Sequence, residues 1–193
     1  MRKKEFEPDD IADAAMQVFW QRGYAATSVQ DLVNGTGLSR SSLYSTFENK
    51  QALYQEALRR YASITTDNVE LLSSQQPAKV LIRELLERIA EDELHDPQRR
   101  GCLVANATLE LAGHDEAVAQ LVAHNLQRLQ KALEKLIQRA QKSGELAADK
   151  SPRALARFVV NTMQGMRVMG KGCAAAQRRQ TLQDVIEVTL AAI

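Results

Sequence analysis

The chain has 193 residues, enough for one large domain or for one small and one medium domain. Its 25 Lys and Arg residues nearly balance its 24 Asp and Glu residues, and no stretch approaches 18 consecutive apolar residues. The composition therefore excludes a generic polycation and a membrane-spanning helix.

Cysteine and histidine are too sparse for a metal centre. Two cysteines form neither a disulfide framework nor a zinc pattern, and three scattered histidines add no metal site. We therefore expect no metal and no other cofactor. The first eight residues carry charges with no apolar run behind them, so we expect no secretory signal and a cytoplasmic protein.

The first predicted helix spans about residues 9–22. Gly23 follows the last periodic residue, as expected for a glycine that ends a helix. The expected inward face consists of Ile11, Ala15, Val18 and Phe19.

Residues 27–50 predict two short helices joined by a tight turn, followed at once by a third helix. Ser28 can cap the first of them, and Asp31 lies at the spacing of a capping box. Gly35 and Gly37 are expected to bracket the turn. Ser39 and Asn49 are suitable caps for the next two helices.

Beyond this segment we expect only helices. The third helix runs from Lys50 into the region of residues 65–72, and residues 73–77 form a boundary loop. The segment 101–112 is apolar almost all round and is expected to be buried. The other predicted helices span about residues 78–94, 116–143, 152–170 and 174–193.

A helix, a glycine turn and a second helix are how many proteins present a helix to the DNA major groove. The same pattern also occurs in ordinary helical bundles. Residues on both sides of the turn decide between the two, because their spacing resembles the DNA-binding domain of the tetracycline-repressor (TetR) family. The matching positions are Ile11, Ala14, Ala15, Val18, Phe19, Gly23, Tyr24, Thr27, Ser28, Gly37, Leu38, Leu43, Tyr44, Phe47, Lys50 and Leu53.

The resemblance implies an all-α protein of about nine helices. Residues 1–50 would form a three-helix helix-turn-helix domain, residues 50–72 a connecting helix, and residues 73–193 a helical domain for ligand binding and dimerisation. Ser45 and Thr46 depart from the family, which often has a tyrosine and a histidine there.

Several polar residues of the motif are candidate contacts with double-stranded operator DNA. Arg40 is the best base reader, because a guanidinium can bind guanine O6 and N7 together. Tyr44 resembles the family tyrosine that meets the DNA backbone and a thymine methyl. The other candidates for phosphate or base contacts are Thr27, Ser28, Ser41, Ser42, Ser45 and Lys50. Each of these residues could instead belong to an ordinary solvated face.

Bulk charge does not explain DNA binding. Residues 1–60 contain eight Lys or Arg and eight Asp or Glu residues, so affinity must come from placed contacts and helix N-termini. Arg2, Lys3 and Lys4 could reach a groove or stay disordered, and the sequence leaves both possibilities open.

One three-helix reader touches few base pairs, so specific binding usually needs two copies on half-sites about 34–36 Å apart or a multiple of it. The resemblance implies a homodimer in which the last two helices pair with those of the second copy. The alternative is that the core of the monomer uses both apolar faces.

The resemblance also implies a pocket for a small-molecule inducer in the C-terminal domain. The tentative lining residues are polar or sulfur-containing positions in apolar helices: Cys102, Asn106, His124, Asn125, Thr162, Met163 and Met166. For the two methionines, core filling is the ordinary alternative.

Cys102 also raises the possibility of redox or electrophile sensing. It follows Arg99, Arg100 and Gly101 at an expected helix N-terminus, where guanidinium charge and the helix dipole favour a thiolate. The alternative is an inert thiol in a packed helix.

The leading hypothesis is a dimeric, ligand-responsive transcriptional regulator, usually a repressor in this family. A DNA-binding dimer with no small-molecule ligand is the alternative. An enzyme is disfavoured, and we name no catalytic residue, because the sequence contains no Gly-rich phosphate loop, HExxH, GxSxG or CxxC motif.

Overall fold

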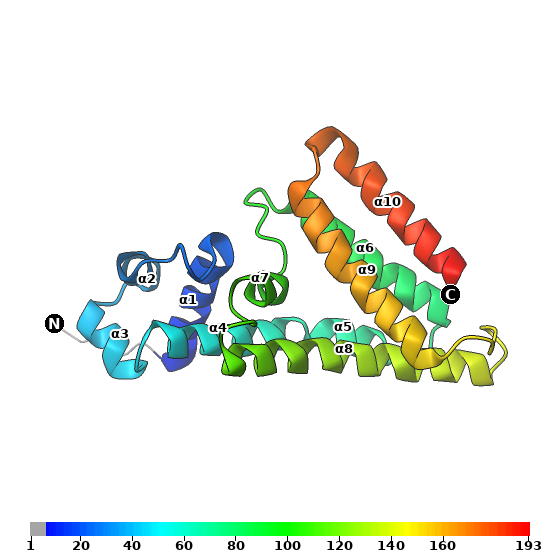
Figure 1. Cartoon of the computed structure of the whole chain (residues 1–193), viewed down its shortest axis with the longest axis horizontal. Helices are drawn as coiled ribbons and strands as arrows, with labels where there is room; N and C mark the ends of the chain where they lie inside the picture. Colours follow the sequence, from blue (N-terminus) through cyan, green and yellow to red (C-terminus); the bar gives the residue numbers. More distant parts are fainter. Residues whose placement is uncertain (1–6) are drawn as a thin grey trace. The chain divides into compact units, whose positions relative to one another are not determined.

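The computed structural model describes residues 7–193, and within this range every regular element is an α-helix. The predicted all-α fold is therefore confirmed. The ten helices shown in Figure 1 are α1 (Pro8–Arg22), α2 (Val29–Thr36), α3 (Arg40–Thr46), α4 (Lys50–Ile64), α5 (Thr66–Leu71), α6 (Ala78–His95), α7 (Leu103–Glu110), α8 (Glu116–Lys142), α9 (Pro152–Gly172) and α10 (Ala175–Ala192).

The chain folds into two compact units. The first contains the residues up to Ile64 together with Leu103–Val122, and the second contains Thr65–Cys102 and Ala123–Ile193. The sequence predicted a division near residue 73. The grouping in the structure differs from it, because α7 packs against α4 and so belongs with the N-terminal helices. Sequence order alone gave no sign of this return.

In the first unit, α1 packs against both α2 and α4. Phe19, Leu32, Leu43 and Leu53 are almost completely buried there, as their spacing predicted. The three predicted helix caps are also present. The Ser28 and Ser39 hydroxyls accept backbone N–H groups of α2 and α3, and Asn49 Oδ1 accepts the N–H of Ala52 at 2.8 Å.

The two glycines near the helix turn have different roles. Gly37 ends α2 in the left-handed region, with φ of +70°, so its role in the turn is confirmed. The expected turn role of Gly35 is wrong, because Gly35 lies inside α2. The Val18 side chain of α1 occupies the space where a Cβ on Gly35 would project. Gly35 therefore allows close packing of α1 on α2.

Two predicted helices differ in extent. The single helix expected from Lys50 to about residue 72 is interrupted at Thr65, in a run of three β-branched residues (Ile64, Thr65 and Thr66) with low helix propensity. The helix expected at 101–112 is shorter, and its predicted burial on all sides is wrong. Leu103, Val104 and Ala107 form a buried stripe, but Leu109 is 81% exposed.

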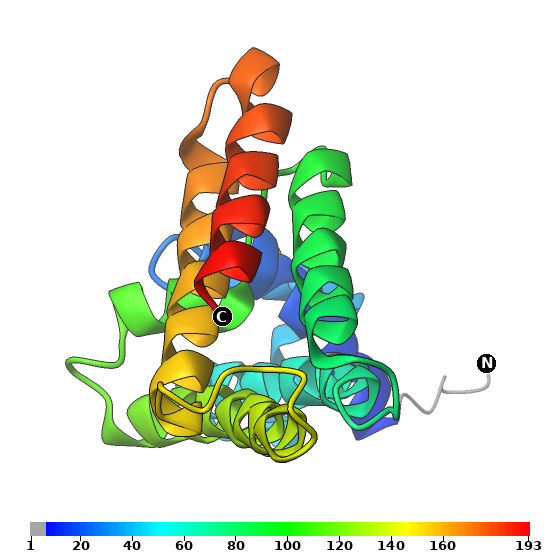
Figure 2. The same cartoon turned by 90° about the vertical axis from the view of Figure 1, so that its right-hand side faces the viewer.

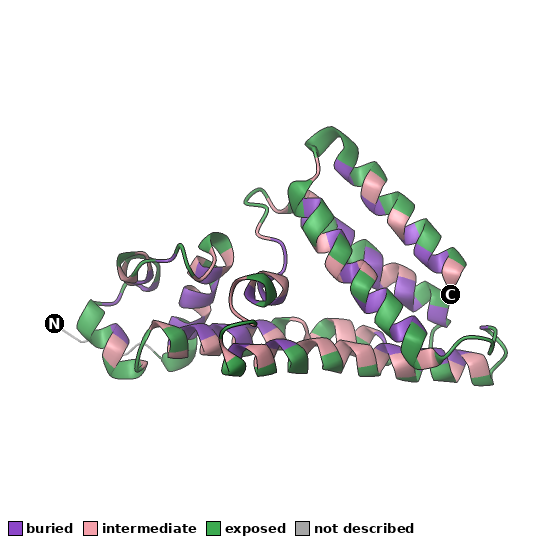
Figure 3. Cartoon of the chain, viewed as in Figure 1, coloured by how far each residue is buried: buried purple, intermediate pink, exposed green. Residues whose placement is uncertain are grey.

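In the second unit, α6, α9 and α10 contact one another and run side by side in both Figure 1 and Figure 2. Their buried residues recur between exposed ones along each helix, as Figure 3 shows. The C-terminal half of α8 adds Leu133, Leu136, Ile137 and Ala140 to the same hydrophobic core. Of the helices described, none is long and apolar enough to cross a membrane.

Candidate DNA-binding interface

An aromatic cluster supports the start of the helix-turn-helix segment. The Tyr54 ring lies 4.9 Å from both the Phe19 and the Tyr24 ring centroids. Lys50 Nζ lies 4.3 Å from the centroid of the Tyr24 ring. This arrangement ties α1, the turn after it and the first turns of α4 into one packed group.

The N-terminus of α2 is closed by a reciprocal capping box. Asp31 N–H donates to Ser28 Oγ at 3.1 Å, and Ser28 N–H donates to Asp31 Oδ2 at 2.9 Å. The Ser28 hydroxyl also donates to Asp31 Oδ2 at 2.6 Å. This bond and the one from the Ser28 N–H, helped by the charge of Arg22, lower the pKa of Asp31. The negative charge of Asp31 therefore serves the cap, as the sequence suggested.

Thr27 and Ser28 are neighbours with different exposure. Thr27 is buried, and its hydroxyl donates to the Gly23 carbonyl at 2.5 Å. Ser28 is exposed at the first residue before α2. Thr27 thus shapes the turn between α1 and α2, whereas Ser28 can meet a phosphate beside the N–H groups of the helix end.

Helix α3 presents short polar groups to solvent. Ser39 Oγ accepts the Ser42 N–H and lies 2.9 Å from the hydroxyls of both Ser41 and Ser42. Ser45 donates to the Ser42 carbonyl at 2.8 Å. Arg40, Ser41, Ser42 and Ser45 are exposed, and Tyr44 is half-buried. Small hydroxyls beside one long guanidinium allow a close approach to DNA.

Lys50 begins α4 and is half-buried against Tyr24. Burial lowers the pKa of Lys50, while the Glu110 and Asp31 carboxylates oppose this shift. Its ammonium group is thus held at a defined place beside the α2 and α3 segment. Arg2, Lys3 and Lys4, the other candidate cations, lie outside the described residues.

The predicted ligand-binding residues do not form one exposed set. Met163 and Met166 are buried in the core of the second unit, and His124 is exposed. Asn125 and Thr162 are half-buried, with Asn125 donating to Thr65 at 3.4 Å and Thr162 donating to the Phe158 carbonyl at 3.0 Å. Asn106 lies on α7 in the first unit.

Cys102 is 8% exposed and immediately precedes α7. It is a free thiol, as is the half-buried Cys173. The nearby Arg100 side chain pairs with Asp96, with 3.2 Å between Nε and Oδ2. Part of the positive charge expected to favour a thiolate at Cys102 is therefore compensated.

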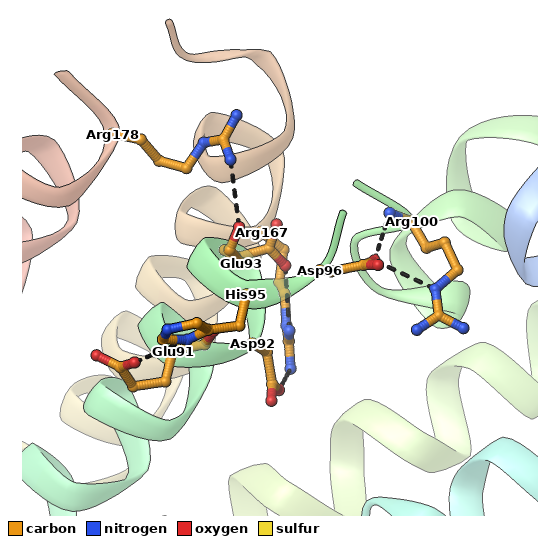
Figure 4. Close-up of polar contacts among 8 residues, drawn as sticks. All are labelled: Glu91, Asp92, Glu93, His95, Asp96, Arg100, Arg167 and Arg178. Carbon is orange, nitrogen blue, oxygen red and sulfur yellow. Dashed lines mark hydrogen bonds and ion pairs between the residues drawn. The ribbon is translucent and has the colours of Figure 1, made fainter. Parts of the chain in front are cut away.

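An ionic cluster that the sequence did not predict lies in the second unit, as Figure 4 shows. Arg167 on α9 pairs with Glu93 at 3.1 Å and with Asp92 at 2.9 Å, both on α6. Arg178 on α10 is buried and donates to the Glu93 carbonyl at 3.4 Å. Burial raises the pKa of the Glu93 carboxyl, and Arg167 opposes the shift. No local motif marks these residues, because they are 74 and 85 positions apart.

Two carboxylates of the first unit were also not predicted from the sequence. Glu110 and Asp115 follow the helix-turn-helix segment by more than fifty residues, yet they hydrogen-bond to Tyr24 and Gln51. Among the described residues, no group of three or more His, Cys, Asp or Glu side chains has the arrangement of a metal site.

Comparison with known proteins agrees with this geometry. Residues 11–57 match the model of bacterial regulatory proteins of the tetR family, and residues 80–186 match the tetracyclin repressor-like C-terminal domain. The uncharacterised HTH-type transcriptional regulator YezE of Bacillus subtilis is 31% identical over the whole chain and 98% of its own length. The HTH-type transcriptional repressor ComR of Escherichia coli is 27% identical over 92% of the chain and 85% of its own length.

A solved structure of the TetR family regulator CifR extends the comparison to the whole fold. A cysteine mutant of CifR, in complex with 26-base-pair operator DNA, matches with a TM-score of 0.85 and 30% identity over 99% of both chains. Because the family models cover both parts of the chain and a relative matches its full length, the chain belongs to the TetR family of DNA-binding transcriptional regulators and is not an enzyme.

Proposed function

We propose that the chain is a repressor that binds a palindromic operator as a homodimer and is released from it by a small molecule or by modification of Cys102. Residues 1–50 would bind DNA, residues 50–72 would connect, and residues 73–193 would bind the ligand and dimerise. The exposed polar face of α3 carries this proposal most directly. An exposed guanidinium among short hydroxyl side chains, on a helix capped by Ser39, suits binding to double-stranded DNA.

Arg40 would read a base, and Lys50 and the N-terminal end of α2 at Ser28 would contact phosphates. Ser41, Ser42, Ser45 and Tyr44 would complete the contacts from α3. Thr27 would act indirectly, by holding the turn from which α2 begins. The repressor names of ComR and DhaR and the operator complex of CifR support this assignment.

Selection from random duplex DNA tests the proposal. The wild type should enrich a palindrome. Arg40→Ala should lose about 1–3 kcal/mol of discrimination against the wrong base at one position of each half-site. Arg88→Ala is the matched control, because Arg88 is an exposed arginine of α6 paired with Glu84. If the wild type enriches no sequence at low salt, the operator-binding proposal is wrong.

Exposed apolar side chains on α9 and α10 support the proposed dimer. Phe158 and Met169 are eleven residues apart, so they lie on the same side of α9, and Val188 of α10 is 67% exposed. Val188→Asp should shift sedimentation from dimer to monomer. Val80→Asp, at an exposed valine of α6, should leave the dimer intact.

The inducer would bind among the helices of the second unit, which contain Cys102, His124, Asn125, Thr162, Met163 and Met166. Asn106, the remaining candidate, lies on α7 in the first unit. A ligand releases the operator only if it binds more tightly to a form of the dimer whose spacing does not fit the half-sites than to the form that binds DNA. A thermal-shift screen with small apolar molecules tests for it. No stabilisation by any of them would favour the alternative, a DNA-binding dimer without a ligand.

Modification of Cys102 is a second route to release. Because Cys102 is almost buried, a reagent would reach it only when the structure around it opens. CifR was solved as cysteine mutants and NemR in a reduced form, which supports testing this thiol. An electrophile should release operator from the wild type but not from Cys102→Ser. Release from both proteins would contradict a role for Cys102.

A further inference from the structure

The segment 110–115 is hydrogen-bonded at two points to the helix-turn-helix region, once to the turn before α2 and once to the start of α4, and both bonds lie inside the first unit. At its beginning, the Glu110 carboxylate accepts the backbone N–H of Tyr24 at 2.7 Å. At its end, Asp115 accepts the Gln51 side-chain amide at 2.5 Å. We call Glu110, Asp115, Tyr24 and Gln51 the carboxylate clasp.

The Glu110 contact holds the turn that leads into α2. Gly23 has φ of +80°, and a Cβ at Gly23 would collide with the Glu110 carboxylate. On the other side of this turn, the Thr27 hydroxyl donates to the Gly23 carbonyl. The bond from α7 thus adds to bonds within the turn, which include Thr27 N–H donating to the Tyr24 carbonyl at 3.2 Å, and α2 begins immediately after it.

The Asp115 contact holds the start of α4. One carboxylate oxygen accepts from Gln51, the residue after Lys50, and the other accepts the Val118 N–H at 3.0 Å and so caps α8. A single side chain therefore joins the first turn of α4 to the first turn of α8. Lys50, a proposed phosphate contact, is adjacent to this link.

The chemistry favours Glu110 as a specific acceptor. Its carboxylate lies near the half-buried Lys50 and the buried Tyr54, where an anion acts more strongly than in water. Burial raises the pKa of Tyr54, and the Glu110 charge adds to this shift. A charge-assisted bond to a backbone N–H is stronger than a neutral one.

We propose that Glu110 and Asp115 are positioning residues for operator binding, which set where α2 and the start of α4 lie. Helix α7 begins one residue after Cys102 and ends at Glu110. A shift of α7 would therefore act through the clasp on the turn before α2 and on the start of α4. This inference rests on the proposed operator binding.

The test compares operator and random-duplex affinity for the wild type and three variants. Glu110→Ala should weaken operator binding at least about fivefold, the lower end of usual coupling between sites, and leave random-duplex binding within about twofold. Glu110→Gln keeps an acceptor oxygen and should restore most of the loss. Glu116→Ala removes an exposed carboxylate of the neighbouring helix and should behave as the wild type.

Hydrogen exchange of the Tyr24 amide gives a readout that needs no DNA. Exchange should accelerate in Glu110→Ala and stay slow in Glu116→Ala. Operator affinity unchanged in Glu110→Ala, or lost equally for operator and random duplexes, would overturn the positioning role. If Glu110→Ala does not fold, the operator and random-duplex affinities of Gln51→Ala test the positioning role instead. A wild type that selects no operator, with Tyr24 exchange still dependent on Glu110, would instead count against operator binding.

Discussion

The two compact units use charged side chains in opposite ways. On α3 the guanidinium of Arg40 is exposed, whereas in the second unit Arg167 and Arg178 are turned inward onto Glu93. An exposed cation keeps its hydration and its freedom to meet a phosphate or a base edge. A buried one is committed to its partner, because leaving that partner alone in a low-dielectric core is unfavourable. Accessibility therefore separates an arginine that can meet DNA, as proposed for Arg40, from one that is committed to the core.

The largest expected effect comes from breaking the buried pair. Arg167→Met would leave Glu93, which is 3% exposed, without its cation and should lower the free energy of unfolding by about 3–5 kcal/mol. Chemical denaturation measures this change. Arg88→Met, at an exposed pair, should change stability by less than about 1 kcal/mol. If the two variants were equally stable, burial would not distinguish the two kinds of arginine.

The buried contact between α1 and α2 should tolerate added volume as poorly as the core of the second unit does. Gly35→Ala places a methyl group against Val18 and should cost about 1–3 kcal/mol of stability through overpacking. A second change, Val18→Ala, should recover part of the loss. Gly113→Ala is the control, because the space around that glycine is open. Thermal unfolding of the four proteins gives the comparison.

Removing the α2 cap tests the exposed side of the first unit. Ser28→Ala removes the acceptor for the Asp31 N–H and should lower stability by about 1 kcal/mol. Ser45→Ala, which removes one donor to the Ser42 carbonyl, should stay within about 0.5 kcal/mol of the wild type. An equal loss in both variants would mean that serine content, rather than the cap, matters.

The smallest effect is a pH dependence of opposite sign in the two units. The pKa of Asp31 is lowered from 3.8, so its stabilising contribution is present above that pH and is lost as the pH falls through the folded value. The pKa of Glu93 is raised from 4.5, so its contribution declines as the pH rises from 4.5 through the folded value. Asp31→Asn should remove the loss of stability at low pH, and Glu93→Gln should remove the loss of stability as the pH rises. Denaturation series between about pH 3 and 7 check both.

The helix ends and the exposed polar face of α3 were determined by the sequence itself, because caps and apolar periodicity act over three or four residues. Ser28, Ser39 and Asn49 cap the helices that their spacing predicted, and Arg40 is exposed where the motif placed it. Such features need no information from distant parts of the chain.

Only the tertiary structure decided which distant residues meet. Gly35 allows α2 to pack on α1 and is not part of the turn. Glu110 binds Tyr24, which is 86 residues away in the sequence, and Glu93 pairs with Arg167, which is 74 residues away. No local pattern signals these contacts, because each depends on segments far apart in the sequence approaching closely. For Glu93, burial also makes an unpaired charge unfavourable. Short-range hydrogen bonds and apolar periodicity set the helix ends and the exposed polar face of α3, whereas long-range packing determined that Glu110 meets Tyr24 and that Glu93 meets Arg167.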